Sequence, residues 1–183
     1  MIFAHWRARR ASKALIEQIR GEIVAAARRP ELYEALGAPD RMDGRFELLT
    51  LHAGLVLRRL AALGGVGDAV AQDLVDSLFS HFDDTLREIG YADVGVAKRL
   101  KTMGRAFYGR NAAYAAALDD TPAELATTLA RNVYGAGGGD APQAEALAHY
   151  VASLDAALGS IPIETFTEGR FRFPLGSIVV PHG

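Results

Sequence analysis

Residues 43–52, DGRFELLTLH, contain a turn, a helix start and the beginning of a nearly all-apolar helix. Asp43 and Gly44 have turn chemistry, because glycine tolerates positive φ and aspartate can bond the backbone that follows it. The chain then stays mainly apolar as far as Leu63, and at helical spacing its apolar residues fall on two faces. A helix of this kind is typically sandwiched between layers, so we expect it to lie centrally and organise the fold.

Polar residues separate the two apolar faces of this predicted helix. Arg45, His52 and Arg59 follow one another at seven-residue spacing between the faces. A general base needs an oriented partner, and none is evident for His52 in the sequence. We therefore interpret His52 as a half-buried hydrogen-bonding residue of the central helix rather than as a catalytic base.

The composition favours packed helices in one domain. Half of the 183 residues are hydrophobic, only 8% are aromatic, and alanine is abundant; this balance suits helices more than a sheet. The absence of cysteine rules out disulfides, thiolate metal sites and a cysteine nucleophile. A formal net charge of −2 gives no general case for nucleic-acid binding.

Six helices and a C-terminal arm are predicted, which makes the fold class all-α. The helices cover 12–28 with a short continuation to 36, the apolar run that ends at 63, and then 68–89, 93–118, 121–134 and 140–158. Residues 170–173, RFRF, alternate at the strand period, but so short a strand needs a partner. We expect a single helical domain over 1–160 and a short extended arm over 161–183 that packs Phe171 and Phe173 on the bundle.

No apolar run is long enough to span a membrane, and the first residues lack the apolar segment of a signal peptide. The start of the chain is basic, with Arg7, Arg9, Arg10 and Lys13. We interpret these residues as a solvated helix end; contact with anionic lipid or a ribosome surface is the alternative. The expected location is the cytoplasm, with peripheral contact at the inner membrane left open.

One candidate metal site occurs in the sequence. His81, Asp84 and Glu88 share a helix face, which resembles the Glu-x-x-His pattern of metal-binding bundles. Arg87 lies beside the trio and is expected to neutralise the carboxylates, so we interpret the group as a solvated acidic face. No Gly-x-Ser-x-Gly elbow is present. The sequence therefore predicts neither an enzyme nor a bound metal or cofactor.

The predicted helix over 93–118 carries a cationic stripe. Lys98, Lys101 and Arg105 share one face, with Arg99 and Arg110 adjacent. Three interpretations are open: a solvated surface, pairing with the acidic face of the preceding helix, or contact with an external phosphate or acidic partner.

Three segments resemble the ubiquinol–cytochrome c chaperone family, in order and spacing, over about residues 20–135. The first holds ARRP (27–30), LY (32–33), DGRF (43–46) and LH (51–52), the second LVDSLF (74–79), Asp83 and LREIG (86–90), and the third VAKR (96–99), Met103, AFYGR (106–110) and Tyr114.

The resemblance implies a helical assembly factor without a catalytic step, here of a bacterial, cytoplasmic type. It implies that the client is cytochrome b, nascent or newly inserted, during assembly of the ubiquinol–cytochrome c reductase complex (complex III). A small partner subunit, the ribosome and the inner membrane are further partners of such factors; no specific nucleic acid is expected.

We therefore expect a chaperone-like protein that binds a hydrophobic client. Aromatic and arginine side chains carry much of the energy of protein interfaces. The candidate client- or partner-binding residues are Arg45, His52, Lys98, Lys101, Arg105, Phe107, Tyr108 and Arg110. For Phe107 and Tyr108, core packing is an equally good interpretation. The competing classes are a ribosome- or RNA-binding module that uses the cationic stripe, and a small helical metalloenzyme.

Overall fold

The structure is a computed structural model that describes residues 2–135, 142–176 and 178. For residues 2–11 and 142 it describes the backbone alone, so the basic side chains at 7, 9 and 10 fall outside the description, as do residues 140 and 141 of the last predicted helix. The described residues contain helices and no strand. The predicted all-α class is confirmed.

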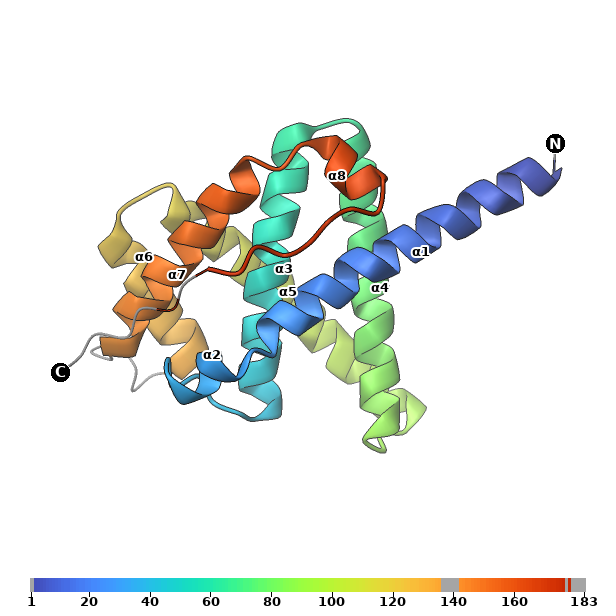
Figure 1. The fold of residues 1–183 in the computed structure, drawn as a ribbon. Helices are drawn as coiled ribbons and strands as arrows, with labels where there is room; N and C mark the ends of the chain where they lie inside the picture. Colours follow the sequence, from blue (N-terminus) through green and yellow to red (C-terminus); the bar gives the residue numbers. More distant parts are fainter. Residues whose placement is uncertain (1, 136–141, 177, 179–183) are drawn as a thin grey trace. The chain divides into compact units, whose positions relative to one another are not determined.

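The helices follow one another as labelled in Figure 1. Their bounds are α1 Ile2–Ala27, α2 Pro30–Glu34, α3 Met42–Leu63, α4 Val66–Glu88, α5 Asp93–Leu118, α6 Pro122–Leu129, the π-helix η1 Ala130–Tyr134, α7 Pro142–Gly159 and α8 Ile163–Thr167. Each of the six predicted helices has a counterpart among them. The sequence analysis missed the change to a π-helix at Ala130 and the short helix α8.

The chain divides into two compact units, which we describe separately. The first unit holds Met1–Glu22, Leu60–Ala106 and Pro162–Arg172, and the second holds Ile23–Arg59, Phe107–Ile161 and Phe173–Gly183. The proposed division into a helical domain over 1–160 and an arm over 161–183 stays a prediction.

In the first unit, α4 buries one face and contacts α8. The buried residues recur at helical spacing: Val70, Leu74, Leu78, Phe82 and Leu86. Phe166 of α8 stacks on Phe171, with 4.8 Å between the ring centroids, and Gln18 of α1 donates a hydrogen bond to the Phe171 carbonyl oxygen at 2.5 Å. These contacts hold residues 166–171 against the helices of this unit.

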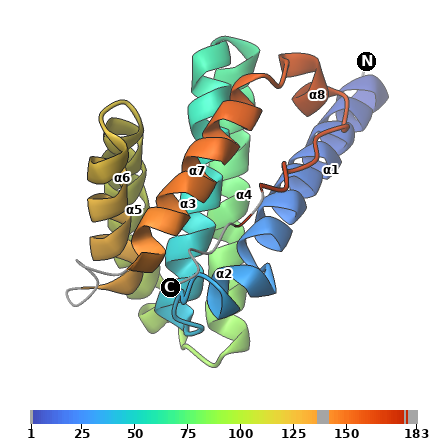
Figure 2. The same cartoon turned by 60° about the vertical axis from the view of Figure 1, so that its left-hand side comes forward.

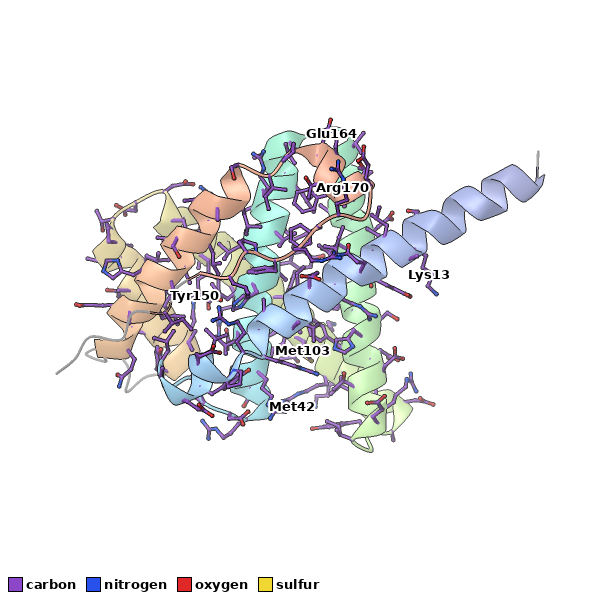
Figure 3. All side chains as sticks on the ribbon, viewed as in Figure 1. Lys13, Met42, Met103, Tyr150, Glu164 and Arg170 are labelled. Atoms are coloured by element: carbon purple, nitrogen blue, oxygen red, sulfur yellow. The ribbon has the colours of Figure 1, made fainter. Side chains whose placement is uncertain are left out.

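In the second unit, α3 is buried on both faces, as predicted. Leu48, Leu51 and Leu55 are at most 2% exposed on one face, and Ala53 and Val56 are fully buried on the other. Helix α7 contacts α6, and the two run side by side in Figures 1 and 2. The buried face of α7 includes Tyr150, which is labelled in Figure 3.

The pair Asp43 and Gly44 does not form a turn ahead of α3, because the helix already begins at Met42. The glycine serves a close approach instead: a Cβ atom on Gly44 would lie 2.0 Å from the carbonyl oxygen of Pro39. Asp43 stands in the first helical turn, where its charge complements the helix dipole.

Candidate functional site

The cationic face of α5, which consists of Lys98, Lys101 and Arg105, is exposed in the first unit. Within the described part of the chain, none of the three side chains takes part in an ion pair or a side-chain hydrogen bond. Three unpaired cations at alternating three- and four-residue spacing point away from one side of the helix. This face can therefore meet an acidic surface.

The acidic residues of α4 do not neutralise this face. Asp83 instead binds Arg87, with 2.6 Å between its Oδ2 and the arginine Nε, and Arg87 also pairs with Asp93 at the start of α5. Internal pairing of the cationic face with the acidic face of α4 is thus not seen among the described residues. The second of the three open interpretations loses its structural support.

His81, Asp84 and Glu88 do not form a metal centre in the described residues, where no group of three or more such side chains is placed to hold an ion. Arg87 turns to Asp83 and Asp93 rather than to this trio. Asp84 lines a cleft with charged residues of both signs: Lys13 and Arg20 of α1, and the acidic Glu17, Asp73 and Asp76.

His52 lies in the interior of the second unit and is fully buried. Its Nδ1 lies 2.7 Å from the Leu48 carbonyl oxygen, which can only accept a hydrogen bond. Nδ1 therefore carries the proton. Nε2 is then an acceptor, and the Tyr150 hydroxyl donates to it at 2.9 Å.

Burial keeps this histidine neutral. Desolvation lowers the pKa of His52 to about 4, against a smaller opposing effect of the bond to Leu48. Burial also raises the pKa of Tyr150 to about 12, while the guanidinium of Arg29 beside the hydroxyl offsets part of the shift. Neither group changes charge near neutral pH, so the pair acts as a structural hydrogen-bond network.

Residues 173–176 cover this network within the second unit. The Phe173 ring lies 5.3 Å from the His52 ring, measured between centroids, and Arg29 donates to the Gly176 carbonyl oxygen at 3.2 Å. A Cβ atom on Gly176 would lie 3.2 Å from the Tyr150 ring, which leaves little room for a larger residue. These contacts attach residues 173–176 to α3 and α7.

A second polar contact joins α3 to α5. Arg110 donates two hydrogen bonds to the Glu47 carboxylate, from Nε to Oε2 at 3.0 Å and from Nη2 to Oε1 at 3.1 Å. The Glu47 side chain is 12% exposed and that of Arg110 35% exposed. Burial raises the pKa of the Glu47 carboxyl, and Arg110 counteracts part of that rise. The pair fixes the start of α3 against α5.

The candidate residues chosen from the sequence are divided between the two units. The cationic face of α5 belongs to the first, whereas Arg45, His52, Phe107, Tyr108 and Arg110 belong to the second. Tyr108 is 59% exposed, and Arg45 is exposed but pairs with Asp40 at 2.7 Å. The eight residues are therefore described in two groups, one in each unit.

The expectation for His52 needs a correction, and of the two interpretations left open for Phe107 the structure supports core packing. His52 was expected to be half-buried and is fully buried, because its two ring nitrogens bond inside the protein. Phe107 is also fully buried, so neither ring lies at the surface to touch a client. Sequence reasoning missed Arg29, Glu47 and Tyr150, whose partners lie far away along the chain.

In the described part of the chain no helix combines the length and apolarity needed to cross a bilayer.

Comparisons with known proteins place these features in context. A family model described as ubiquinol–cytochrome C chaperone matches residues 34–173. The chain is also similar to a crystal structure of the Cbp3 homolog from Brucella abortus, with 36% sequence identity and a TM-score of 0.83, over 95% of this chain and 97% of that one. No curated protein matches.

Proposed function

Because this chain belongs to the ubiquinol–cytochrome c chaperone family, we propose that it binds newly made cytochrome b and assists the assembly of complex III. The observation that carries the proposal is the agreement of sequence and fold: the family match spans 34–173, and the similarity to the Brucella structure extends over nearly the whole chain. The proposed role is binding and release of a client, without a catalytic step.

The cationic face of α5 is the part of the candidate site best suited to contact a partner. Its three side chains are exposed and unpaired among the described residues, so binding would not first have to break internal ion pairs. Tyr108 offers an exposed aromatic ring in the second unit, and tyrosine and arginine are enriched among residues that dominate interfaces. We assign acidic segments of the client or of a small partner subunit to this face.

The proposal includes a location and further partners. Client binding would take place at the cytoplasmic face of the inner membrane, where newly made cytochrome b enters the bilayer, with peripheral contact of the chaperone and without a bound cofactor. The ribosome is a second partner class, and the unpaired cations of α5 favour it as the alternative function. Contact with ribosomal RNA would weaken steeply as salt rises, because phosphate contacts release counterions.

Affinity purification from host membranes in mild detergent tests the proposal. The wild-type chain should co-purify with cytochrome b, and replacing the whole cationic face with glutamine should reduce the yield. A matched control replaces Lys13, Arg170 and Arg172, whose side chains are 65–79% exposed, and should retain the client. Recovery of ribosomes without cytochrome b would support the alternative and contradict the proposal.

A further inference from the structure

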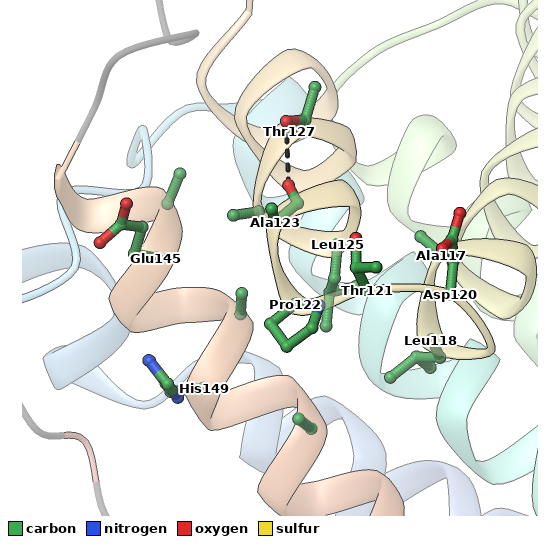
Figure 4. Close-up of a pocket in the computed structure, with 14 residues that line it drawn as sticks. Ala117, Leu118, Asp120, Thr121, Pro122, Ala123, Leu125, Thr127, Glu145 and His149 are labelled. Atoms are coloured by element: carbon green, nitrogen blue, oxygen red, sulfur yellow. Dashed lines mark hydrogen bonds between the residues drawn. The ribbon is translucent and has the colours of Figure 1, made fainter.

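A groove in the second unit lies outside all the residues discussed so far. It has a volume of about 760 Å³ and is formed by the end of α5, α6 with the residues just before it, and the first half of α7. Figure 4 shows α6 and α7 on its two sides, with Pro122 directed from the start of α6 toward α7. A volume of this size is typical of sites that take up a ligand or a partner's side chains.

Small apolar side chains line both walls of the groove. On α7, Ala144, Ala148 and Ala152 recur every four residues and so share one face; on α6, Ala123 and Ala126 stand opposite. Ala144 and Ala148 are at most 4% exposed, so they form the floor, whereas Ala123 and Ala152 are exposed at the opening. Walls of alanine allow another helix to approach closely and to insert larger apolar side chains.

Two carboxylates and one histidine, His149, are exposed in the lining of the groove. Asp120, before α6, and Glu145, in the first turn of α7, are exposed lining residues. Neither forms an ion pair or a side-chain hydrogen bond with any residue that the structure describes. A neighbouring carboxylate, Asp119, is bound by Arg58. Two unpaired negative charges beside an apolar groove favour a partner that combines apolar residues with lysine or arginine.

We propose that this groove binds a membrane-spanning helix of the client before or during its insertion, with basic residues at the end of that helix pairing with Asp120 and Glu145. The inference rests on the proposed function, since it takes the client to be a membrane protein. Spanning helices are apolar and are flanked by lysine and arginine at their cytoplasmic ends, which is the combination that the groove complements. The alanine walls shield the apolar side chains from water, and the two carboxylates set the position of the basic end.

Site-specific photo-crosslinking in host membranes separates this inference from the proposed function. A benzophenone amino acid replaces Ala152 at the groove, the exposed Ala157 on another face of α7 outside the groove, or Lys98 on α5. We expect cytochrome b to be captured from position 152 and not from 157. If cytochrome b is captured from position 98 but not from 152, the groove is not the binding site, while the proposed function still stands. Absence of capture from all three positions contradicts both.

Binding of a synthetic helix tests the chemistry directly. The probe is a 20-residue leucine–alanine peptide with two lysines at one end, held in mild detergent micelles with the full-length protein. Ala152→Leu should weaken binding about tenfold by filling the opening, whereas Ala157→Leu, the matched control on another face of the same helix, should leave it unchanged. Thermal melting of both variants establishes that they fold. Equal binding to both contradicts the assignment.

The role of the two carboxylates is tested with neutral variants. The double variant Asp120→Asn, Glu145→Gln should weaken binding of the lysine-ended peptide about threefold at low salt, and the difference should shrink at high salt. Asp68→Asn removes an exposed acid from the first turn of α4 and should have no effect. The proposal is overturned if a peptide ending in two glutamates binds as well as the lysine peptide. It is also overturned if light scattering shows that a second copy of the chain occupies the groove.

Discussion

Replacing His52 with leucine should change the pH dependence of stability in a way that identifies the buried neutral ring. The pKa of His52 is about 4 in the folded protein and about 6.5 in an unfolded chain. Between these values the unfolded chain binds a proton that the folded protein excludes, so folding is favoured above pH 6.5 and becomes less favourable as pH falls toward 4. A difference of about 2.5 pKa units corresponds to about 3 kcal/mol at 1.36 kcal/mol per unit.

The order of stability of His52→Leu and the wild type should reverse across this pH range. Near pH 7.5, His52→Leu should lower the free energy of unfolding by about 2 kcal/mol, because the Tyr150 hydroxyl loses its hydrogen-bond acceptor. Tyr150 is only 2% exposed, so water cannot easily replace that acceptor. At pH 4 the wild type has lost about 3 kcal/mol of stability through protonation of His52 in the unfolded chain. The variant has no such group and loses nothing by this route, so it should be at least as stable as the wild type. Other titrating groups are common to both chains and cancel in the difference.

Chemical denaturation followed by circular dichroism at several pH values measures this difference. Tyr150→Phe serves as the matched control, because it keeps the histidine: it should cost about 1–3 kcal/mol at neutral pH and should retain the pH dependence of the wild type. A gap between wild type and His52→Leu that is the same at pH 7.5 and pH 4 would refute the reasoning, since the ring would then titrate normally in the folded state.

Replacing the cationic face of α5 with glutamine should alter stability by about 0.5 kcal/mol or less per residue while client binding weakens most at low salt; thermal melting and pull-down on one sample check both, and a clear loss of melting temperature contradicts it. Arg110→Ala should destabilise by about 2 kcal/mol and more than Glu47→Ala in denaturant titrations, because it strands the more deeply buried partner. Gly109→Ala, in open space within a helix, should stabilise by about 0.5–1 kcal/mol, whereas Gly44→Ala should destabilise by about 1–3 kcal/mol through its clash with a backbone oxygen; equal melting temperatures would contradict this pair. Elemental analysis should find no stoichiometric transition metal, and about one metal per chain that is lost on His81→Ala would overturn that expectation.

The long helices could be predicted because their signals are local. The spacing of Leu48, Leu51 and Leu55 is set by the helical repeat, and the burial of this face follows from it. The N-cap of α6 is likewise local: the Thr121 side chain accepts a hydrogen bond from the backbone of Glu124, three residues away. The short helix α8 carries too few residues for a periodic pattern to show.

The polar contacts of the interior could not be predicted, because they join residues remote in sequence. His52 and Tyr150 are 98 residues apart, and Glu47 and Arg110 are 63 apart. Only the fold brings such pairs together. The exposure of the cationic face of α5 could be predicted from the sequence, since charged residues that share one helical face rarely lie in a core. For Phe107, the neighbouring sequence contains no signal that distinguishes an aromatic residue of the core from one at an interface.

Deletion of the gene in its host is the measurement that tests the central claim most directly. Haem b absorbance and quinol–cytochrome c reductase activity would be measured in the deletion strain, with another respiratory complex as the internal reference. If the protein assists cytochrome b during assembly, both signals should fall while the reference stays near normal, and the wild-type chain should restore them. Unchanged haem b spectra and unchanged quinol oxidation in a clean deletion would contradict the account.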